Sequence, residues 1–135
     1  AYIWAALDVL KAERIDHGVQ AVHDAALMQR LAQDRIPLTV CPLSNQKLCV
    51  FPDLRDHNLA ALLDAGLVAT VNSDDPAYFG GYMNENFLQT FAATQMPAQH
   101  AYTLACNSFE ASFIDASAKR AYRDRVDAAF ASFGG

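Results

Sequence analysis

The sequence lacks the features that mark secreted and membrane-spanning proteins. It has only three cysteines and no C-x-x-C pair, which indicates a reduced compartment, and we expect a cytoplasmic protein. No apolar run approaches the length of a membrane span, so no membrane association is expected. Asp8 and Lys11 come too early for the apolar core of a signal peptide.

Positive charge is also scarce. The formal net charge is -5 and no basic stripe is present to neutralise phosphates, which argues against nucleic-acid binding. With 53% hydrophobic and 19% charged residues, the 135-residue chain is typical of one globular domain with one core. It shows no internal repeat or linker, and it does not begin with Met, so we expect a piece of a longer protein.

Strand-like and helix-like segments alternate along the first half of the chain. We predict strands over residues 14–18, 36–42 and 67–73, and helices over 1–12, 24–34, 57–65, 83–94, 97–113 and 115–132. Asp24 and Asp115 are expected N-caps, and Gly66 fits the position after a helix. The pattern predicts an α/β fold with a buried parallel sheet, and residues 43–56 form a long loop.

Polar side chains follow each predicted strand at the point where the strand ends. The endings are Asp16-His17-Gly18, Cys41 to Asn45, and Asn72 to Pro76. Because active sites of parallel α/β proteins gather at the carboxyl ends of the strands, we expect all three endings on one rim.

These residues also have purely structural interpretations. His17 is compatible with a buried core histidine, Asp74 with a cap of the segment that follows it, and Ser44 and Asn45 with turn formers. Cys41 is predicted to be a small buried hydrophobic residue. The same reading covers Cys49 and Cys106, and a surface position is predicted for His23, His57 and His100.

The adjacent carboxylates Asp74 and Asp75 indicate a functional role as well as a structural one. Neighbouring carboxylates repel one another and persist where a cation or a ligand compensates them. Because side chains alternate along a strand, the two should point differently, one toward a metal and the other toward a substrate. With His17 as a base or stabiliser beside them, the set favours metal-assisted hydrolysis.

Three segments resemble a known family. RIDHG (14–18), CPLSNQKLCVF (41–51) and NSDDPAYFGGY (72–82) are similar to the adenosine/adenine deaminase family of zinc amidohydrolases, in its order and spacing and over nearly the whole chain. Asp16, NQKL and AYFGGY are closer to adenine deaminases. The resemblance therefore implies a purine substrate, with adenine favoured and adenosine as the alternative.

The resemblance also implies a fold and a set of roles. The family fold is a (β/α)8 TIM-type barrel, and the family binds zinc, which lowers the pKa of a water that displaces ammonia from the purine. By resemblance, His17 matches the catalytic histidine, Asp74 the zinc-binding carboxylate, and Asp75 the residue that hydrogen-bonds the purine ring.

Two family motifs do not occur in the chain, the H-x-H pair and the H-A-G-E box that supply the other zinc ligands. We therefore expect residues 1–135 to be the C-terminal portion of a single barrel domain of roughly 250 residues, without its N-terminal strands. The isolated chain is predicted to be inactive and to self-associate through exposed strand edges. The alternative is a non-catalytic fragment, or a split-barrel half that needs a partner chain.

Two other classes of protein, one of enzymes and one of signalling domains, do not match the motifs of this sequence. A cytidine-type deaminase requires H-x-E and P-C-x-x-C, and neither motif is present. A phosphoacceptor receiver domain carries its Asp pair on an early strand, whereas this pair follows the last predicted strand.

Overall fold

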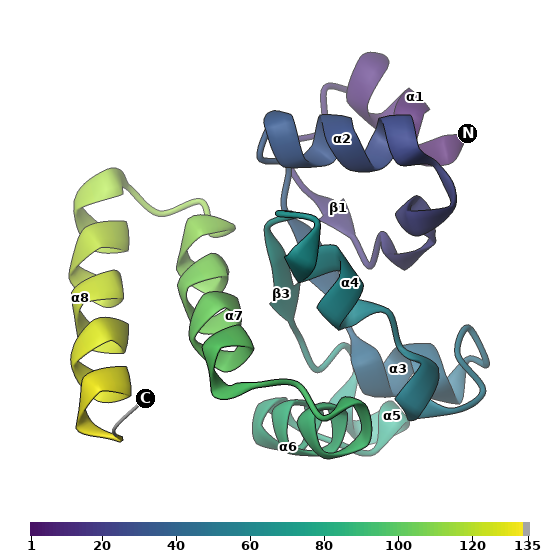
Figure 1. The fold of residues 1–135 in the computed structure, drawn as a ribbon. Helices are drawn as coiled ribbons and strands as arrows, with labels where there is room; N and C mark the ends of the chain where they lie inside the picture. The colour runs from purple at the N-terminus through teal and green to yellow at the C-terminus, as the bar shows by residue number, and fades with distance from the viewer. Residues whose placement is uncertain (134–135) are drawn as a thin grey trace.

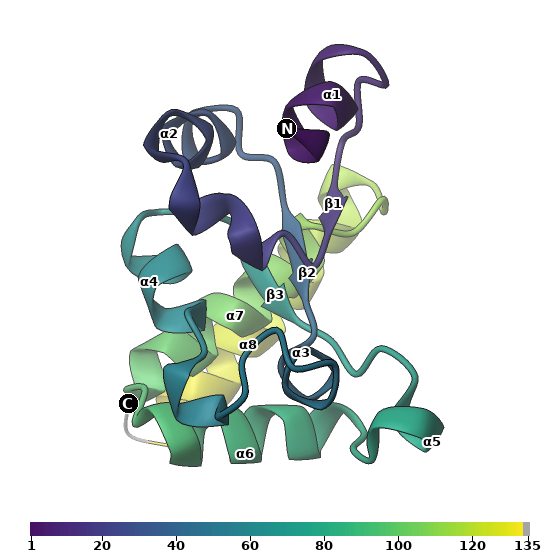
Figure 2. The ribbon, with the colours of Figure 1, turned by 90° about the vertical axis from the view of Figure 1, so that its right-hand side faces the viewer.

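Three short parallel strands lie at the centre of the computed structural model, which describes residues 1–133 (Figures 1 and 2). They are β1 (Ile15–Asp16), β2 (Leu38–Val40) and β3 (Ala69–Val71), in the order β1-β2-β3. Leu38 pairs with Ile15 on one side and with Ala69 on the other. The sheet is therefore parallel, as predicted, and its strands are shorter than the predicted segments.

Helices connect and cover these strands. They are α1 (Tyr2–Asp8), the 3-10 helix η1 (Val19–His23), α2 (Ala25–Gln33), α3 (Pro42–Lys47), the 3-10 helix η2 (Leu54–Asp56), α4 (Leu59–Asp64), α5 (Pro76–Phe79), α6 (Met83–Thr94), α7 (Ala98–Glu110) and α8 (Ala116–Ser132). Helices α4 and α7 pack on β3, α6 packs on α3 and η2, and α8 packs on α7. Figure 1 shows α7 and α8 side by side at one flank of the molecule.

The core lies between the sheet and its covering helices. All three residues of β3 are buried, as expected for a parallel strand covered on both faces. The leucines that are fully removed from solvent are Leu31, Leu38, Leu59, Leu62 and Leu104. Burial of one such side chain contributes about 1.5–3 kcal/mol, so this set is a main source of the fold's stability.

Several predicted ends of helices are confirmed. Asp24 Oδ1 accepts a hydrogen bond of 3.0 Å from the Leu27 N–H, and its Oδ2 accepts one of 2.7 Å from Trp4 Nε1, which joins α2 to α1. Asp115 caps α8, and Gly66 follows α4 with φ +80°. Helix α6 spans the predicted residues 83–94.

Other boundaries differ from the prediction. The first helix ends at Asp8 instead of residue 12, and the chain then turns at Lys11, whose φ of 54° lies in the left-handed region. Leu10, which the predicted helix would include, is 77% exposed. Pro97 is the N-cap of α7, which ends at Glu110 instead of residue 113.

The predicted loop over residues 43–56 is largely helical, and this is the main correction to the fold. It contains α3 and η2, and the short helix α5 after β3 was also not predicted. Long-range contacts stabilise α3: Asn86 Oδ1 accepts from the Leu43 N–H at 3.3 Å, and Asn86 Nδ2 donates to the Gly81 carbonyl at 3.1 Å. A Cβ on Gly81 would overlap Leu43, so glycine permits this close approach.

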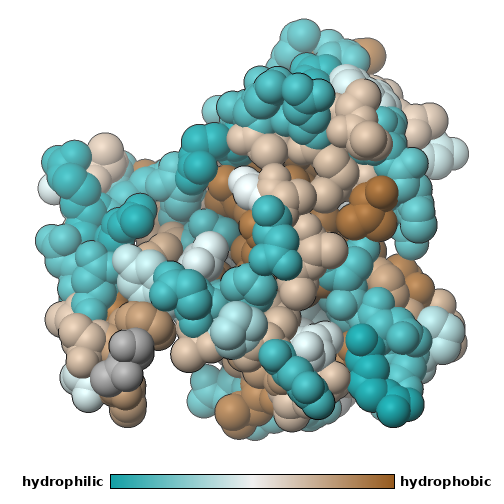
Figure 3. Space-filling model, viewed as in Figure 1, coloured by the Kyte–Doolittle hydropathy of each residue, from teal (hydrophilic) through white to brown (hydrophobic). Residues whose placement is uncertain are grey.

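The surface carries exposed apolar side chains. Figure 3 shows apolar residues reaching the surface near the middle of the viewed face. Tyr2 and Phe133 are 93% and 88% exposed. Among the described residues, no helix has both the length and the apolar character that crossing a bilayer requires.

Candidate active site

The end of β1 projects His17. Its N–H donates to the Thr39 carbonyl at 2.9 Å, which extends the pairing with β2 by one residue. His17 then adopts a left-handed backbone with φ 56°, followed by Gly18 with φ 73°. A Cβ at Gly18 would lie 2.7 Å from Leu38 Cδ2, so this turn requires glycine.

The end of β3 projects Asp74 in a similar way. The Asn72 N–H donates to the Val40 carbonyl at 2.8 Å and Asn72 Nδ2 donates to Thr70 Oγ1 at 2.8 Å, which fixes the backbone after the strand. Asp74 follows with a left-handed φ of 57°. Non-glycine residues adopt this conformation infrequently, with His and Asp among those that tolerate it best. Here it occurs at both chain turns beside the cavity described below, and also at Lys11, Arg35, Cys49 and Gln95.

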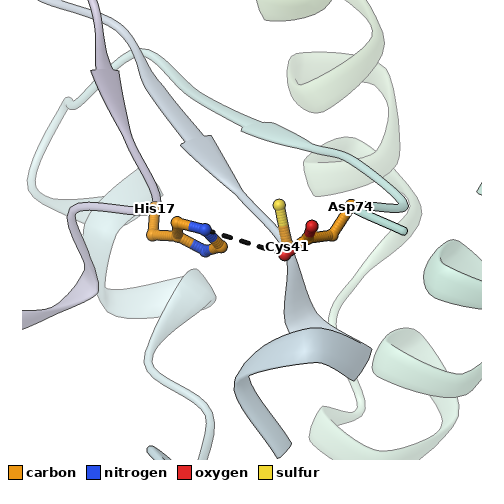
Figure 4. A group of neighbouring side chains, drawn as sticks. All are labelled: His17, Cys41 and Asp74. Atoms are coloured by element: carbon orange, nitrogen blue, oxygen red, sulfur yellow. Dashed lines mark ion pairs between the residues drawn. The ribbon is translucent and has the colours of Figure 1, made fainter. Parts of the chain in front are cut away.

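His17, Cys41 and Asp74 converge from three strand ends, as Figure 4 shows. Their ligand atoms lie within 4.8 Å of one another, and His17 Nε2 is 3.7 Å from Asp74 Oδ2. They line a cavity of about 440 Å³ whose wall also includes Arg14, Thr39, Asn72 and Met83. The structure thus brings together two of the three predicted site residues, and histidine nitrogen and carboxylate oxygen are atom types that bind zinc.

Cys41 is a site residue that the sequence analysis treated as core. It is buried, as predicted, but its sulfur lies among the site's polar atoms. Burial and the charges of Asp74 and Asp16 raise the pKa of the thiol to about 12, so it is neutral near pH 7. The same prediction is wrong for Cys49, which is exposed, and Cys106 is half-buried.

Asp75, the residue after Asp74, makes a different contact. Its Oδ1 accepts a hydrogen bond of 3.1 Å from the Tyr78 N–H and so caps α5. The capping role considered for Asp74 therefore belongs to Asp75, and the two carboxylates make different contacts. Both residues follow the end of β3 and Asp74 has a left-handed backbone, so alternation along a strand does not account for the difference. The role of Asp75 in purine binding stays a prediction.

Asn45 and His57 form a second layer behind His17. Asn45 Nδ2 is 3.4 Å from His17 Nδ1, and Asn45 Oδ1 is 3.2 Å from His57 Nε2. His57 is only 5% exposed, so the predicted surface position is wrong, and Asn45 lies in α3 instead of in a turn. The signal available in the sequence was the apolar helix LAALL that begins two residues after His57.

His23 and His100 lie outside this group. His23 is exposed, as predicted. His100 is partly buried, and its Nε2 is 3.1 Å from Asp64 Oδ1.

A side-chain cluster beside a cavity at the carboxyl ends of parallel strands is the arrangement of α/β-barrel enzymes. Comparison with protein-family models identifies the family. Residues 1–129 match the model described as adenosine deaminase, and the chain belongs to the adenosine deaminase family.

Individual relatives agree with this assignment. The chain is 71% identical to the adenine deaminase of Albidiferax ferrireducens over 98% of this chain and 39% of the relative. It is 61% identical to the adenine deaminase of Trichlorobacter lovleyi over 96% of this chain and 37% of the relative. The chain therefore spans less than two fifths of the length of these relatives.

Solved structures confirm the predicted fold class, part of a TIM-type barrel with three parallel strands. The crystal structure of adenine deaminase from Arthrobacter aurescens, 47% identical, superposes with a TM-score of 0.90 over 93% of this chain and 38% of that one. An amidohydrolase from Burkhoderia ambifaria with bound Zn, 24% identical, gives a TM-score of 0.88 over 98% of this chain and 37% of that one. The second likeness concerns the fold alone.

Proposed function

We propose that the protein to which this chain belongs is a zinc-dependent adenine deaminase, which converts adenine and water to hypoxanthine and ammonia. The observation that carries the proposal is the 71% identity to a relative named adenine deaminase, over nearly all of this chain. The cavity of about 440 Å³ beside His17 and Asp74 supports it, because small-molecule sites have volumes in this range.

The carboxylate of Asp74 fits a zinc ligand. Asp74 offers a carboxylate oxygen at the rim of the cavity, close to a histidine nitrogen and a cysteine sulfur. Asp74 would hold the metal, together with ligands from the rest of the protein. A bound zinc ion would supply a water of lowered pKa at this place.

The chain's own residues would then act around that water. His17 is 41% exposed at its side chain, so its ring is accessible from the cavity for proton transfer or charge stabilisation. Asp75 would hydrogen-bond the purine ring with the oxygen that does not cap α5. Cys41, a neutral thiol, adds little negative charge beside Asp74.

Adenine and adenosine share the reacting amino group, so discrimination depends on room for the ribose. Three aromatic residues follow the second and third strands and could limit that room: Phe51, Tyr78 and Phe79. The centroid of the Phe51 ring lies 4.5 Å from that of His57, and Phe79 is buried. Tyr78 is 77% exposed and packs edge-on against Phe79, with ring centroids 5.0 Å apart, so it is the most accessible of the three.

The test of this proposal is a comparison of kcat/KM for adenine and adenosine with the full-length protein. We expect adenine to be preferred by a large factor. A clear preference for adenosine would leave the family assignment intact and overturn the adenine assignment. Absence of both activities in a zinc-loaded, folded protein would overturn the proposed function itself.

We further propose that residues 1–135 are the C-terminal portion of one barrel domain and that the chain, expressed alone, self-associates. Strands β1 and β3 are the outer strands of the described sheet, and an apolar cavity of about 350 Å³ lies beside Ile15 and Val19. Open strand edges and apolar surface both favour association. Size-exclusion chromatography should show oligomers without purine hydrolysis, and a compact, active monomer would contradict this.

A further inference from the structure

We propose that Asn45 and His57 are positioning residues that fix the tautomer of His17, with its ring proton on Nε2 facing Asp74. The three side chains form a hydrogen-bonded relay from the backbone of α4 to the site. The assignment of the tautomer is independent of the proposed deaminase activity, whereas its kinetic consequence rests on it.

The relay begins at a backbone donor of fixed polarity. The Leu59 N–H donates to His57 Nδ1 at 3.1 Å, so this ring nitrogen carries no proton. Burial lowers the pKa of His57 to about 4, and the ring is therefore neutral near pH 7. A neutral imidazole has one N–H, and in His57 it must be on Nε2.

This proton sets the orientation of the Asn45 amide. His57 Nε2 lies 3.2 Å from Asn45 Oδ1, so the N–H donates to the amide oxygen. The opposite orientation would place two donors face to face, with both side chains buried and water excluded. Asn45 therefore turns its Nδ2 toward His17, and its place in α3 keeps it there.

The amide in turn selects the acceptor on His17. Asn45 Nδ2 is 3.4 Å from His17 Nδ1, a long hydrogen bond in which Nδ1 must accept. Neutral His17 then carries its proton on Nε2, the nitrogen that lies 3.7 Å from Asp74 Oδ2. The ring thus presents its N–H to the carboxylate and the cavity, while Nδ1 is occupied by Asn45.

Reversing the polarity of one link tests the relay. Asn45→Asp preserves the shape of the side chain but offers only acceptors to both histidines. In full-length protein labelled with 15N-histidine, we expect His17 Nδ1 to become protonated, with its signal assigned by its loss in His17→Asn. We also expect kcat to fall about 10- to 100-fold with little change in KM, as is typical of residues that orient a ligand or base. Gln46→Glu introduces the same charge one residue further along α3 and should change neither measurement.

A second pair of variants separates the relay from packing. His57→Phe retains an aromatic ring against Phe51 but has no N–H, whereas His57→Gln retains a donor. We expect mixed His17 tautomers and reduced kcat in His57→Phe, and a larger share of the Nε2–H tautomer in His57→Gln. An unchanged His17 spectrum in folded Asn45→Asp would overturn the proposal. If that variant does not fold, identical His17 spectra for the wild type and His57→Phe would overturn it. A wild-type protein inactive on purines would refute the proposed function and leave the tautomer measurement valid.

Discussion

The strand ends that carry His17 and Asp74 differ from the C-terminal helix α8 in how their residues are held in place. At the strand ends, His17 and Asp74 stand on left-handed turns, and buried polar groups position His17 from behind. Helix α8 has no buried residue. It contacts α7 through the stacked rings of Phe109 and Tyr122, 4.6 Å apart, and a hydrogen bond of 2.7 Å from Tyr102 to Asp127.

The difference has a physical meaning. The strand-end turns have left-handed backbone, and hydrogen bonds to β2 fix the chain at each of them: the His17 N–H donates to the Thr39 carbonyl and the Asn72 N–H to the Val40 carbonyl. Helix α8 adds a layer behind α7, which itself packs on β3. Substitutions at the strand ends should therefore change catalytic activity much more than the free energy of unfolding. Substitutions on α8 should change the free energy of unfolding more than catalytic activity.

The largest effect is expected from Asp74→Asn in the full-length protein. Asparagine tolerates the left-handed backbone and retains the shape, so the change removes mainly the charge. Removing a direct ligand should weaken zinc binding by more than the roughly 10- to 100-fold seen when outer residues are changed, and nearly all activity should disappear. Metal analysis and kcat measure both effects.

The same change on α8 provides the control. Asp124→Asn also removes one carboxylate charge, from an exposed position, and should leave the zinc content at the wild-type level. Equal zinc content in Asp74→Asn and Asp124→Asn would show that Asp74 is not a ligand.

A smaller effect is expected from His17→Asn. This variant also tolerates the left-handed turn and should keep zinc, because His17 is assigned to the water and not to the metal. Loss of a general acid or base lowers kcat by about 10²- to 10⁴-fold. His23→Asn, at an exposed histidine at the end of η1, should have normal kcat. Loss of zinc from His17→Asn would instead make His17 a ligand.

The sequence predicted the convergence of His17 and Asp74 because parallel strands place their carboxyl ends on one edge. It did not predict α3, since that short helix depends on Asn86 and Gly81, about forty residues away in the chain. The burial of His57 was missed for the same reason. Its packing partner Phe51 and its acceptor Asn45 belong to a segment that local pattern alone indicates to be a loop.

His57 should also make stability depend on pH. Its pKa is lowered by burial from 6.5 to about 4, so between these values the unfolded chain binds more protons than the folded one. The stabilising contribution is complete above pH 6.5 and is lost as pH falls toward 4, by about 3 kcal/mol in total. His57→Gln should lose this dependence.

Denaturant unfolding of the full-length wild type and of His57→Gln at pH 7.5 and pH 5 measures the effect. The other histidines and all carboxylates are common to both proteins. The two proteins should therefore differ in how the free energy of unfolding changes with pH only through His57. Identical slopes would mean that His57 is charged or exposed in the folded protein.

The smallest effect is expected on α8. Asp115 Oδ1 accepts from the Ser117 and Ala118 N–H groups at 2.8 and 2.9 Å, and Asp115→Ala removes this cap. The loss should be about 1 kcal/mol, detected by faster amide exchange along α8 in the full-length protein, while kcat and zinc content stay at wild-type values. Asp124→Ala, in the middle of the same helix, should change stability by less than about 0.5 kcal/mol. A large fall in kcat in Asp115→Ala would mean that α8 takes part in shaping the site, and the separation between the two regions would not hold.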